Sequence, residues 1–110
     1  MSYIPQQGDI VSINFDPRIG HEQKGRRPGL IVSNIEYNKR SGMAIVCPIT
    51  NTFSGFPMHV ALDERTTTRG EIMCEQVKSL DLNARQVQYE EFVPDDILDE
   101  VIDLICSFIE

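Results

Sequence analysis

Tryptophan is absent from this chain of 110 residues, and no run of apolar residues is long enough to span a membrane. A transmembrane helix needs about 20 predominantly apolar residues, so we expect no integral membrane protein. The stretch from Met1 to Pro5 has neither the basic residues nor the apolar core of a signal peptide. We therefore expect a cytoplasmic protein.

Cysteine is scarce, and Cys47, Cys74 and Cys106 are widely spaced with no Cys-x-x-Cys pair. A secreted disulfide scaffold usually has a denser, even set of cysteines. A zinc site needs about four clustered Cys or His ligands, and the histidines are limited to His21 and His59. The cysteines have apolar sequence neighbours, so we predict buried free thiols in a reducing compartment, with no metal centre and no cofactor.

The length and an apolar fraction of 41% suit a single domain over residues 1–110 with one modest core. Alternating and β-branched runs separated by turn residues predict short strands. These strands cover 9–15, 30–33, 43–49, 57–62, 70–80 and 86–92. The first should be half-buried, with Val11, Ile13 and Phe15 on one face. Pro48 indicates an edge or a bulge in the third, and a short helical turn fits residues 34–40.

The C-terminal segment has a different periodicity, because its apolar residues recur at steps of three and four. They are Ile97, Leu98, Val101, Ile102, Ile105, Phe108 and Ile109. Pro94 suits a first helical turn, and Asp95 and Asp96 complement the positive end of the helix dipole. Short strands followed by one amphipathic helix predict a mainly β (α+β) fold, a small antiparallel barrel or sheet with the helix packed on it.

The segment 16–28 is a long connection between two predicted strands, and loops of such length are often functional. After Asp16-Pro17 it contains four cations, one imidazole and one carboxylate: Arg18, Lys24, Arg26, Arg27, His21 and Glu22. Guanidinium groups bind phosphate through paired N–H donors. The loop is therefore a candidate phosphate-binding site, although a plain solvated loop explains the composition almost as well.

Three sequence blocks follow one another between residues 8 and 85. The first is Gly8-Asp9-Ile10 with Phe15-Asp16-Pro17 and Gly20-His21-Glu22-Gln23-x-Gly25-x-Arg27-Pro28; the second is Val46-x-Pro48-x-Thr50 with Gly55-Phe56-Pro57; the third is Cys74-Glu75-Gln76-Val77-Lys78-Ser79-Leu80-Asp81 with Ala84-Arg85. In order and spacing these blocks resemble those of the MazF/PemK family of toxin endoribonucleases.

The resemblance implies an SH3-like barrel, usually a homodimer, that cleaves single-stranded RNA, often messenger RNA, at short sequences without a metal. In that reaction the ribose 2′-OH attacks the adjacent phosphorus and leaves a 2′,3′-cyclic phosphate and a 5′-OH end. A cognate antitoxin, whose extended acidic segment lies across the RNA-binding groove, inhibits such toxins.

Carried over by position, Arg27 and Thr50 match the family's most characteristic catalytic residues, and His21 and Glu22 match positions implicated in activity or RNA contact. With a pKa above about 12, Arg27 is a poor base, and we expect it to stabilise charge on the phosphoryl oxygens. Thr50 could donate its hydroxyl to the same oxygens, or be an ordinary strand residue. Either His21 or Glu22 could accept the 2′-OH proton.

RNA binding without tryptophan needs other stacking surfaces, and Phe53 and Phe56 are candidates, although Phe56 could equally belong to the core. The RNA-binding residues that we predict are Gln23, Lys24, Arg26, Phe53, Phe56, Arg69, Glu75, Gln76 and Lys78. In some members of the family the resemblance implies an Asp with an Arg two places before it, where this chain has Glu75 and Met73. Arg69 or Lys78 could replace that Arg, or Glu75 could be a solvated strand carboxylate.

Two alternatives share the expected barrel. A gyrase-poisoning toxin of the CcdB type would resemble its relatives in a Trp-Gly-Ile ending, whereas this chain ends Ser107-Phe108-Ile109-Glu110. A binding module without catalysis is the second alternative, and the presence of both Arg27 and Thr50 argues against it. Cleavage of RNA distinguishes the endoribonuclease from either alternative.

The net charge of −7 at first suggests a protein that RNA would repel. However, all ten Lys and Arg precede residue 86, whereas eight of the seventeen Asp and Glu follow it. The acids therefore gather on or just before the predicted terminal helix, and the segment 16–40 is locally basic. This distribution allows RNA, or the acidic segment of an antitoxin, to bind on one face.

Overall fold

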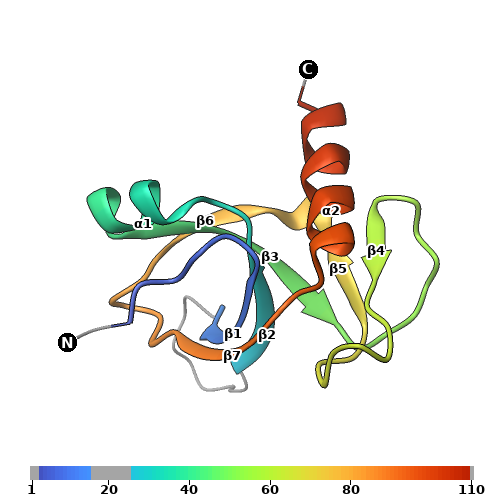
Figure 1. The fold of residues 1–110 in the computed structure, drawn as a ribbon, viewed down its shortest axis with the longest axis horizontal. Coiled ribbons are helices and arrows are strands. Elements are labelled where there is room, and N and C mark those ends of the chain that lie inside the picture. Colours follow the sequence, from blue (N-terminus) through green and yellow to red (C-terminus); the bar gives the residue numbers. More distant parts are fainter. Residues whose placement is uncertain (1–2, 16–25, 110) are drawn as a thin grey trace.

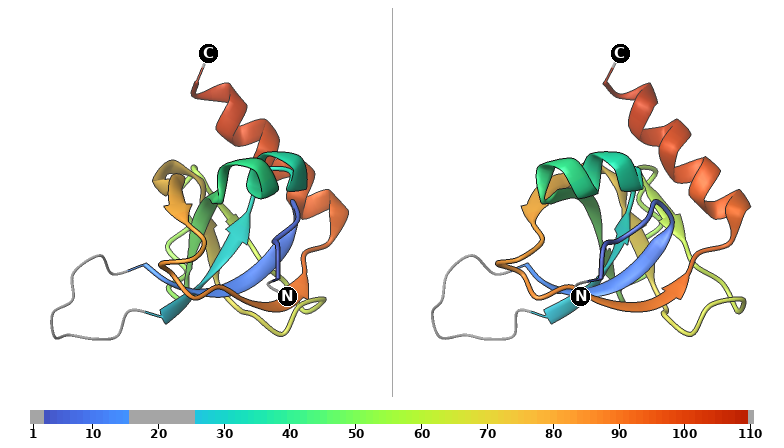
Figure 2. Two further views of the ribbon diagram at one scale, coloured as in Figure 1. Left: turned by 90° about the vertical axis from the view of Figure 1, so that its left-hand side faces the viewer. Right: turned by 60° about the vertical axis from the view of Figure 1, so that its left-hand side comes forward.

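The computed structural model describes residues 3–15 and 26–109. Within them, an antiparallel sheet curls into a small barrel, and both helices lie at one end of it (Figures 1 and 2). The elements are β1 (Asp9–Asn14), β2 (Arg26–Ile31), α1 (Ile35–Ser41), β3 (Met43–Thr50), β4 (His59–Ala61), β5 (Glu71–Met73), the 3-10 turn η1 (Cys74–Gln76), β6 (Lys78–Asp81), β7 (Gln88–Phe92) and α2 (Asp95–Ser107). The strand order is β4-β5-β3-β2-β1-β7, and β6 also pairs with β3. The predicted mainly β fold with a C-terminal helix is confirmed.

β3 is the central strand, so the prediction that Pro48 marks a sheet edge is wrong. On one side of β3 the partner is β2; on the other side it changes from β6, which pairs with Met43–Val46, to β5, which pairs with Ile49 and Thr50. Pro48 falls in the gap between these two partners, where its missing N–H costs no ladder bond. The same change of partner divides the predicted strand 70–80 into β5, η1 and β6.

Two apolar clusters cover opposite faces of the sheet, because alternate residues of a strand point to opposite sides. Cluster 1 includes Ile10, Leu30, Ile49 and Ile72 and packs against α2. Cluster 2 consists of Val11, Ile13, Ile31, Ala44, Val46 and Leu80, with Phe15, Leu82 and Val87 against it. β1 is therefore buried on both faces, whereas we predicted a half-buried strand.

α2 packs on cluster 1 through Ile97, Val101 and Ile105, as its periodicity predicts. Phe108 and Ile109 lie beyond the end of α2 and are exposed, so the predicted stripe is too long. No described helix is long and apolar enough to cross a membrane.

The cysteine prediction is correct for two thiols and wrong for the third. Cys47 and Cys74 are buried free thiols in cluster 1, but Cys106 is exposed. Cys106 follows Ile105, which faces the core, and one residue along a helix turns the side chain by about 100°.

α1 confirms the helical turn predicted at 34–40. The Asn34 side chain caps it by accepting from the Tyr37 N–H at 2.9 Å, and Gly42 ends it with a φ of 72°. A left-handed glycine of this kind is a common end of a helix.

Candidate functional site

Arg27 and Thr50 come from adjacent strands and lie on the same side of the sheet. Arg27 pairs with Ile13 of β1, and Ile13 belongs to cluster 2. On β3, Thr50 has the same parity as Val46, which is also in cluster 2. The β2–β3 pairing ends at Gly29 with Pro48, and Arg27 and Thr50 each stand two residues beyond that pair on their strands. The motif positions are therefore neighbours on one face.

The next positions on this face are Glu71 and His59. Thr50 pairs directly with Glu71 of β5, and His59 of β4 pairs with Met73, two residues further along β5. Alternate residues share a side, so both side chains lie on the same face as Thr50. We call this side of the sheet, with Arg27, Thr50, Glu71 and His59, the site face.

Phe15 and Lys78 extend the site face on the side of β6. The Lys78 ammonium lies 5.7 Å from the centroid of the Phe15 ring. A Cβ added to Gly29 would meet Phe15 Cζ at 3.0 Å and Val46 Cγ1 at 2.8 Å. Because glycine stands at this position, the Phe15 ring packs directly over the strand that carries Arg27.

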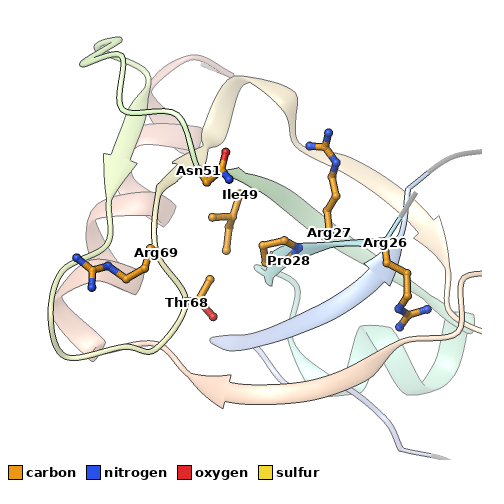
Figure 3. Close-up of a pocket in the computed structure, with 7 residues that line it drawn as sticks. All are labelled: Arg26, Arg27, Pro28, Ile49, Asn51, Thr68 and Arg69. Carbon is orange, nitrogen blue, oxygen red and sulfur yellow. The ribbon is translucent and has the colours of Figure 1, made fainter. Parts of the chain in front are cut away.

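The Arg27 side chain is exposed and makes no hydrogen bond or ion pair with the described part of the chain, whereas the side chain of its neighbour Arg26 is held in place. Arg26 donates to Ser12 Oγ at 3.0 Å, to the Ser12 carbonyl at 2.8 Å and to the Gln86 carbonyl at 2.6 Å. Figure 3 shows the two guanidinium groups pointing to opposite sides of β2. Of the two, Arg27 is the cation that can reach a bound anion without breaking a contact.

A pocket of about 440 Å³ lies at the rim where β2 begins and β3 ends. Its lining residues are Arg26, Arg27, Pro28, Ile49, Asn51, Thr68 and Arg69 (Figure 3). Pro28 and Ile49 alternate with Arg27 and Thr50, so part of the lining belongs to the side opposite the site face, although Arg27 also lines the pocket and Thr50 does not. It therefore lies beside the Arg27–Thr50 pair rather than beneath it.

The loop between β3 and β4 carries both predicted stacking residues, Phe53 and Phe56. Phe53 and Phe56 are 58% and 46% exposed, so Phe56 is not a core residue. The Phe56 ring meets the His59 ring edge-on, with centroids 5.1 Å apart. The Thr50 Oγ1 accepts from the Thr52 N–H at 3.2 Å, which orients the hydroxyl and leaves its hydrogen available.

The Glu71 carboxylate fixes this loop through hydrogen bonds. It accepts from the Gly55 N–H at 3.0 Å, the Ser54 hydroxyl at 3.2 Å and His59 Nδ1 at 2.8 Å. The His59 bond comes first among the effects that lower the pKa of Glu71 to about 2, and the Gly55 and Ser54 donors act in the same direction. Glu71 is therefore a buried carboxylate that stays ionised at neutral pH.

Among the remaining predicted RNA-binding residues, Glu75 bonds His59 Nε2 at 3.2 Å, Gln76 is exposed on η1, and Arg69 lines the rim pocket. His21, Glu22, Gln23 and Lys24 fall outside the described residues, and the roles assigned to them stay predictions. Within 3–15 and 26–109, no group of three or more His, Cys, Asp or Glu side chains is placed to hold a metal ion.

The turn between β4 and β5 is fixed by Glu91 of β7, which sequence reasoning did not identify. Its carboxylate accepts from the Thr67 N–H at 3.0 Å, and from the Thr68 N–H and hydroxyl at 2.7 Å each. Burial alone would raise the pKa of Glu91, but these donors lower it. At the other end of the turn, Arg65 joins Asp63 to Asp96 of α2 at 2.9 Å each. Thr68 and Arg69 are thereby held at the rim pocket.

We expect Glu91→Ala to lower the free energy of unfolding by about 2 kcal/mol, because it leaves partly buried donors without an acceptor. Urea unfolding followed by circular dichroism measures this loss. The matched control is Glu90→Ala at the exposed neighbouring position, which should change stability by less than about 0.5 kcal/mol. Equal losses in the two variants would show that the carboxylate of Glu91 does not fix the turn.

Known proteins resemble the chain over nearly its whole length. Residues 6–109 match the family described as PemK-like, MazF-like toxin of type II toxin–antitoxin system. The endoribonuclease toxin MazF of Escherichia coli K12 is 37% identical, over 76% of this chain and 74% of that protein. The endoribonuclease PemK of Escherichia coli is 34% identical, over 94% and 81%. In the MazE–MazF crystal structure (Form-II) from Deinococcus radiodurans, the similar chain is 35% identical with a TM-score of 0.91, covering 98% of this chain and 97% of that one.

Proposed function

The chain belongs to the PemK-like, MazF-like family of type II toxins, and we propose that it is an endoribonuclease that cleaves single-stranded RNA without a metal. The observation that carries this proposal is that Arg27 and Thr50 lie on the same face of two adjacent strands. A fork of guanidinium donors and a hydroxyl, both reachable from one side, suit the oxygens of a phosphodiester.

In the proposed reaction the 2′-oxygen forms a bond to the adjacent phosphorus while the bond from phosphorus to the 5′-oxygen breaks. The 2′-OH proton goes to a general base, and the leaving 5′-oxygen takes up a proton from Arg27 or from water. Arg27 and Thr50 donate to the phosphoryl oxygens, on which negative charge develops. The base is His21 or Glu22, as the sequence predicts.

The RNA would lie across the site face and the adjoining loop. Phe53 is exposed beside Thr50 and offers a ring on which a base can stack. Lys78 over Phe15 adds a cation and a second ring on the other side of Arg27. Arg26, Arg69, Glu75 and Gln76, with Gln23 and Lys24, complete the RNA-binding residues of this proposal.

We extend the proposal to the partners of the toxin. A cognate antitoxin would place an acidic segment over the same basic surface; the MazF of Deinococcus radiodurans has been crystallised with MazE. We also propose a cytoplasmic homodimer, and light scattering on the purified protein tests the dimer. The CcdB-type reading is not favoured, since the relatives named above are endoribonucleases.

The test incubates the purified protein with a long single-stranded RNA in excess EDTA at neutral pH. We expect fragments that end in 2′,3′-cyclic phosphate and begin with 5′-OH, and mapping their ends gives the cleavage sequence. The control is the same RNA with a 2′-O-methyl group at the cleavage site, which removes the nucleophile and should stop cleavage there. Intact RNA after incubation with antitoxin-free protein, or cleavage that EDTA stops, would contradict the proposal.

A further inference from the structure

His59 joins two carboxylates that come from different elements. Its Nδ1 lies 2.8 Å from Glu71 Oε1, and its Nε2 lies 3.2 Å from Glu75 Oε2. An ionised carboxylate accepts hydrogen bonds and donates none, so both ring nitrogens must carry a hydrogen. With both carboxylates ionised, the charged imidazolium is the form that donates to each of them. The side chains of His59 and Glu71 are 10% and 6% exposed, which places this ion pair largely out of water.

The charged and titratable groups around His59 are Glu71 from β5 and Cys74 and Glu75 from η1. Glu100 of α2 also acts electrostatically on Cys74. The loop 51–58 contributes no charged side chain. Burial by itself would lower the pKa of His59, but the bonds to Glu71 and Glu75 and the charges of these two residues raise it above its ordinary value.

Glu71 transmits the position of His59 to the loop that follows Thr50. One of its oxygens accepts from the Gly55 N–H, and the other accepts from both the Ser54 hydroxyl and His59. Phe56 rests edge-on against the imidazole itself. The loop that carries Phe53 and Phe56 is therefore held by a largely buried ion pair through Ser54, Gly55 and Phe56.

On the premise that the chain cleaves RNA, we propose that His59 is a positioning residue that holds the loop 51–58 in its RNA-binding conformation only while it is protonated. A neutral imidazole keeps one N–H, so one carboxylate would then face a nitrogen lone pair. Because the bonds to Glu71 and Glu75 raise the pKa of His59, the imidazole is charged and both bonds are formed below about pH 6.5, the ordinary pKa of histidine. The charged pair is lost as the pH rises through the higher pKa that His59 has in the folded protein.

The amide of Gly55 gives a direct measurement of this interaction, because it donates to Glu71 at 3.0 Å. Hydrogen exchange by NMR, corrected for the intrinsic pH dependence, should show its protection falling about tenfold as His59 loses its proton. The chain contains two histidines, so His21→Gln assigns the imidazole signal of His59 and gives its titration midpoint. Over the same pH range KM for RNA should rise about tenfold, as expected for losing a stacked base, with a smaller change in kcat.

Two variants separate the charge of His59 from its packing. His59→Lys keeps a cation at all these pH values and should retain Gly55 protection and a low KM with no pH dependence. His59→Gln is neutral throughout and should show weak protection and a high KM at every pH. If Gly55 protection is independent of pH and equal in wild type and His59→Gln, the proposal is wrong. A wild-type protein that cleaves no RNA would overturn the proposed function, while Gly55 protection would still decide whether His59 holds the loop.

Discussion

Replacing Arg27 with alanine should lower kcat for RNA cleavage by about 10²–10³-fold, the loss typical of removing a donor to a developing oxyanion. The Arg27 side chain is exposed and makes no hydrogen bond or ion pair with the described part of the chain, so the fold should depend little on it. Single-turnover cleavage of a defined RNA measures the chemical step, and thermal unfolding of the same preparation checks stability. A variant that melts like wild type but cleaves this slowly would place Arg27 in the chemistry.

Arg27→Lys and Arg26→Ala are the matched controls. The lysine variant keeps the charge but not the planar fork, so it should recover part of the lost rate. Arg26 bonds the backbone of Ser12 and Gln86, and its removal should therefore reduce the unfolding midpoint and raise KM before it changes kcat. An unchanged kcat in Arg27→Ala would show that another residue stabilises the phosphoryl oxygens.

Local periodicity predicts most of the fold, since burial on a strand or helix repeats within a few residues. β1, α1 and α2 are found where the pattern puts them. Local periodicity does not predict the division of 70–80 into β5, η1 and β6, because that division depends on where the two strands pair along β3. Apolar sequence neighbours are also a poor guide to which residue of a helix faces the core. They predict that Cys106 is buried, but its position on α2 turns its side chain away from the core.

The candidate site, too, is only partly predictable from the sequence. Arg27 and Thr50 stand in recognisable motifs, but His59 and Glu71 are separated by twelve residues and form no sequence pattern. The sequence suggested Arg69 or Lys78 as the cation near Glu75. The structure instead brings His59 to Glu75 from the neighbouring strand, directly opposite Met73. The register of β4 and β5 is needed to see that His59, rather than Arg69 or Lys78, lies beside Glu75.

The acidic character of the chain is compatible with RNA binding because of the side on which the acids lie. α2, which carries many of them, packs on cluster 1, whereas Arg27 and Thr50 lie on the opposite face of the sheet. Arg65 also pairs with Asp96 at the start of α2. RNA affinity should consequently be modest and decrease with salt, since a few cations on one face make the contacts.

Gly70→Ala should destabilise the protein by about 3 kcal/mol or more and abolish cleavage with it. Gly70 has a φ of 127°, a conformation that other residues rarely adopt, and an added Cβ would lie 2.0 Å from the Thr50 carbonyl oxygen. No flexible side chain can yield there, because the obstacle is the backbone of Thr50 and Asn51. The end of β3 would have to move away from β5, and urea unfolding together with a cleavage assay measures both consequences.

Gly42→Ala provides the control, since Gly42 also has a positive φ of 72° but nothing within 4 Å of an added Cβ. It should cost about 1 kcal/mol from backbone strain alone and leave cleavage unchanged. The difference between the two variants isolates the close approach of Gly70 to Thr50 from the general cost of a left-handed residue. If both variants lose the same stability and both still cleave, Thr50 tolerates displacement, and its position opposite Glu71 is not what places its hydroxyl for catalysis.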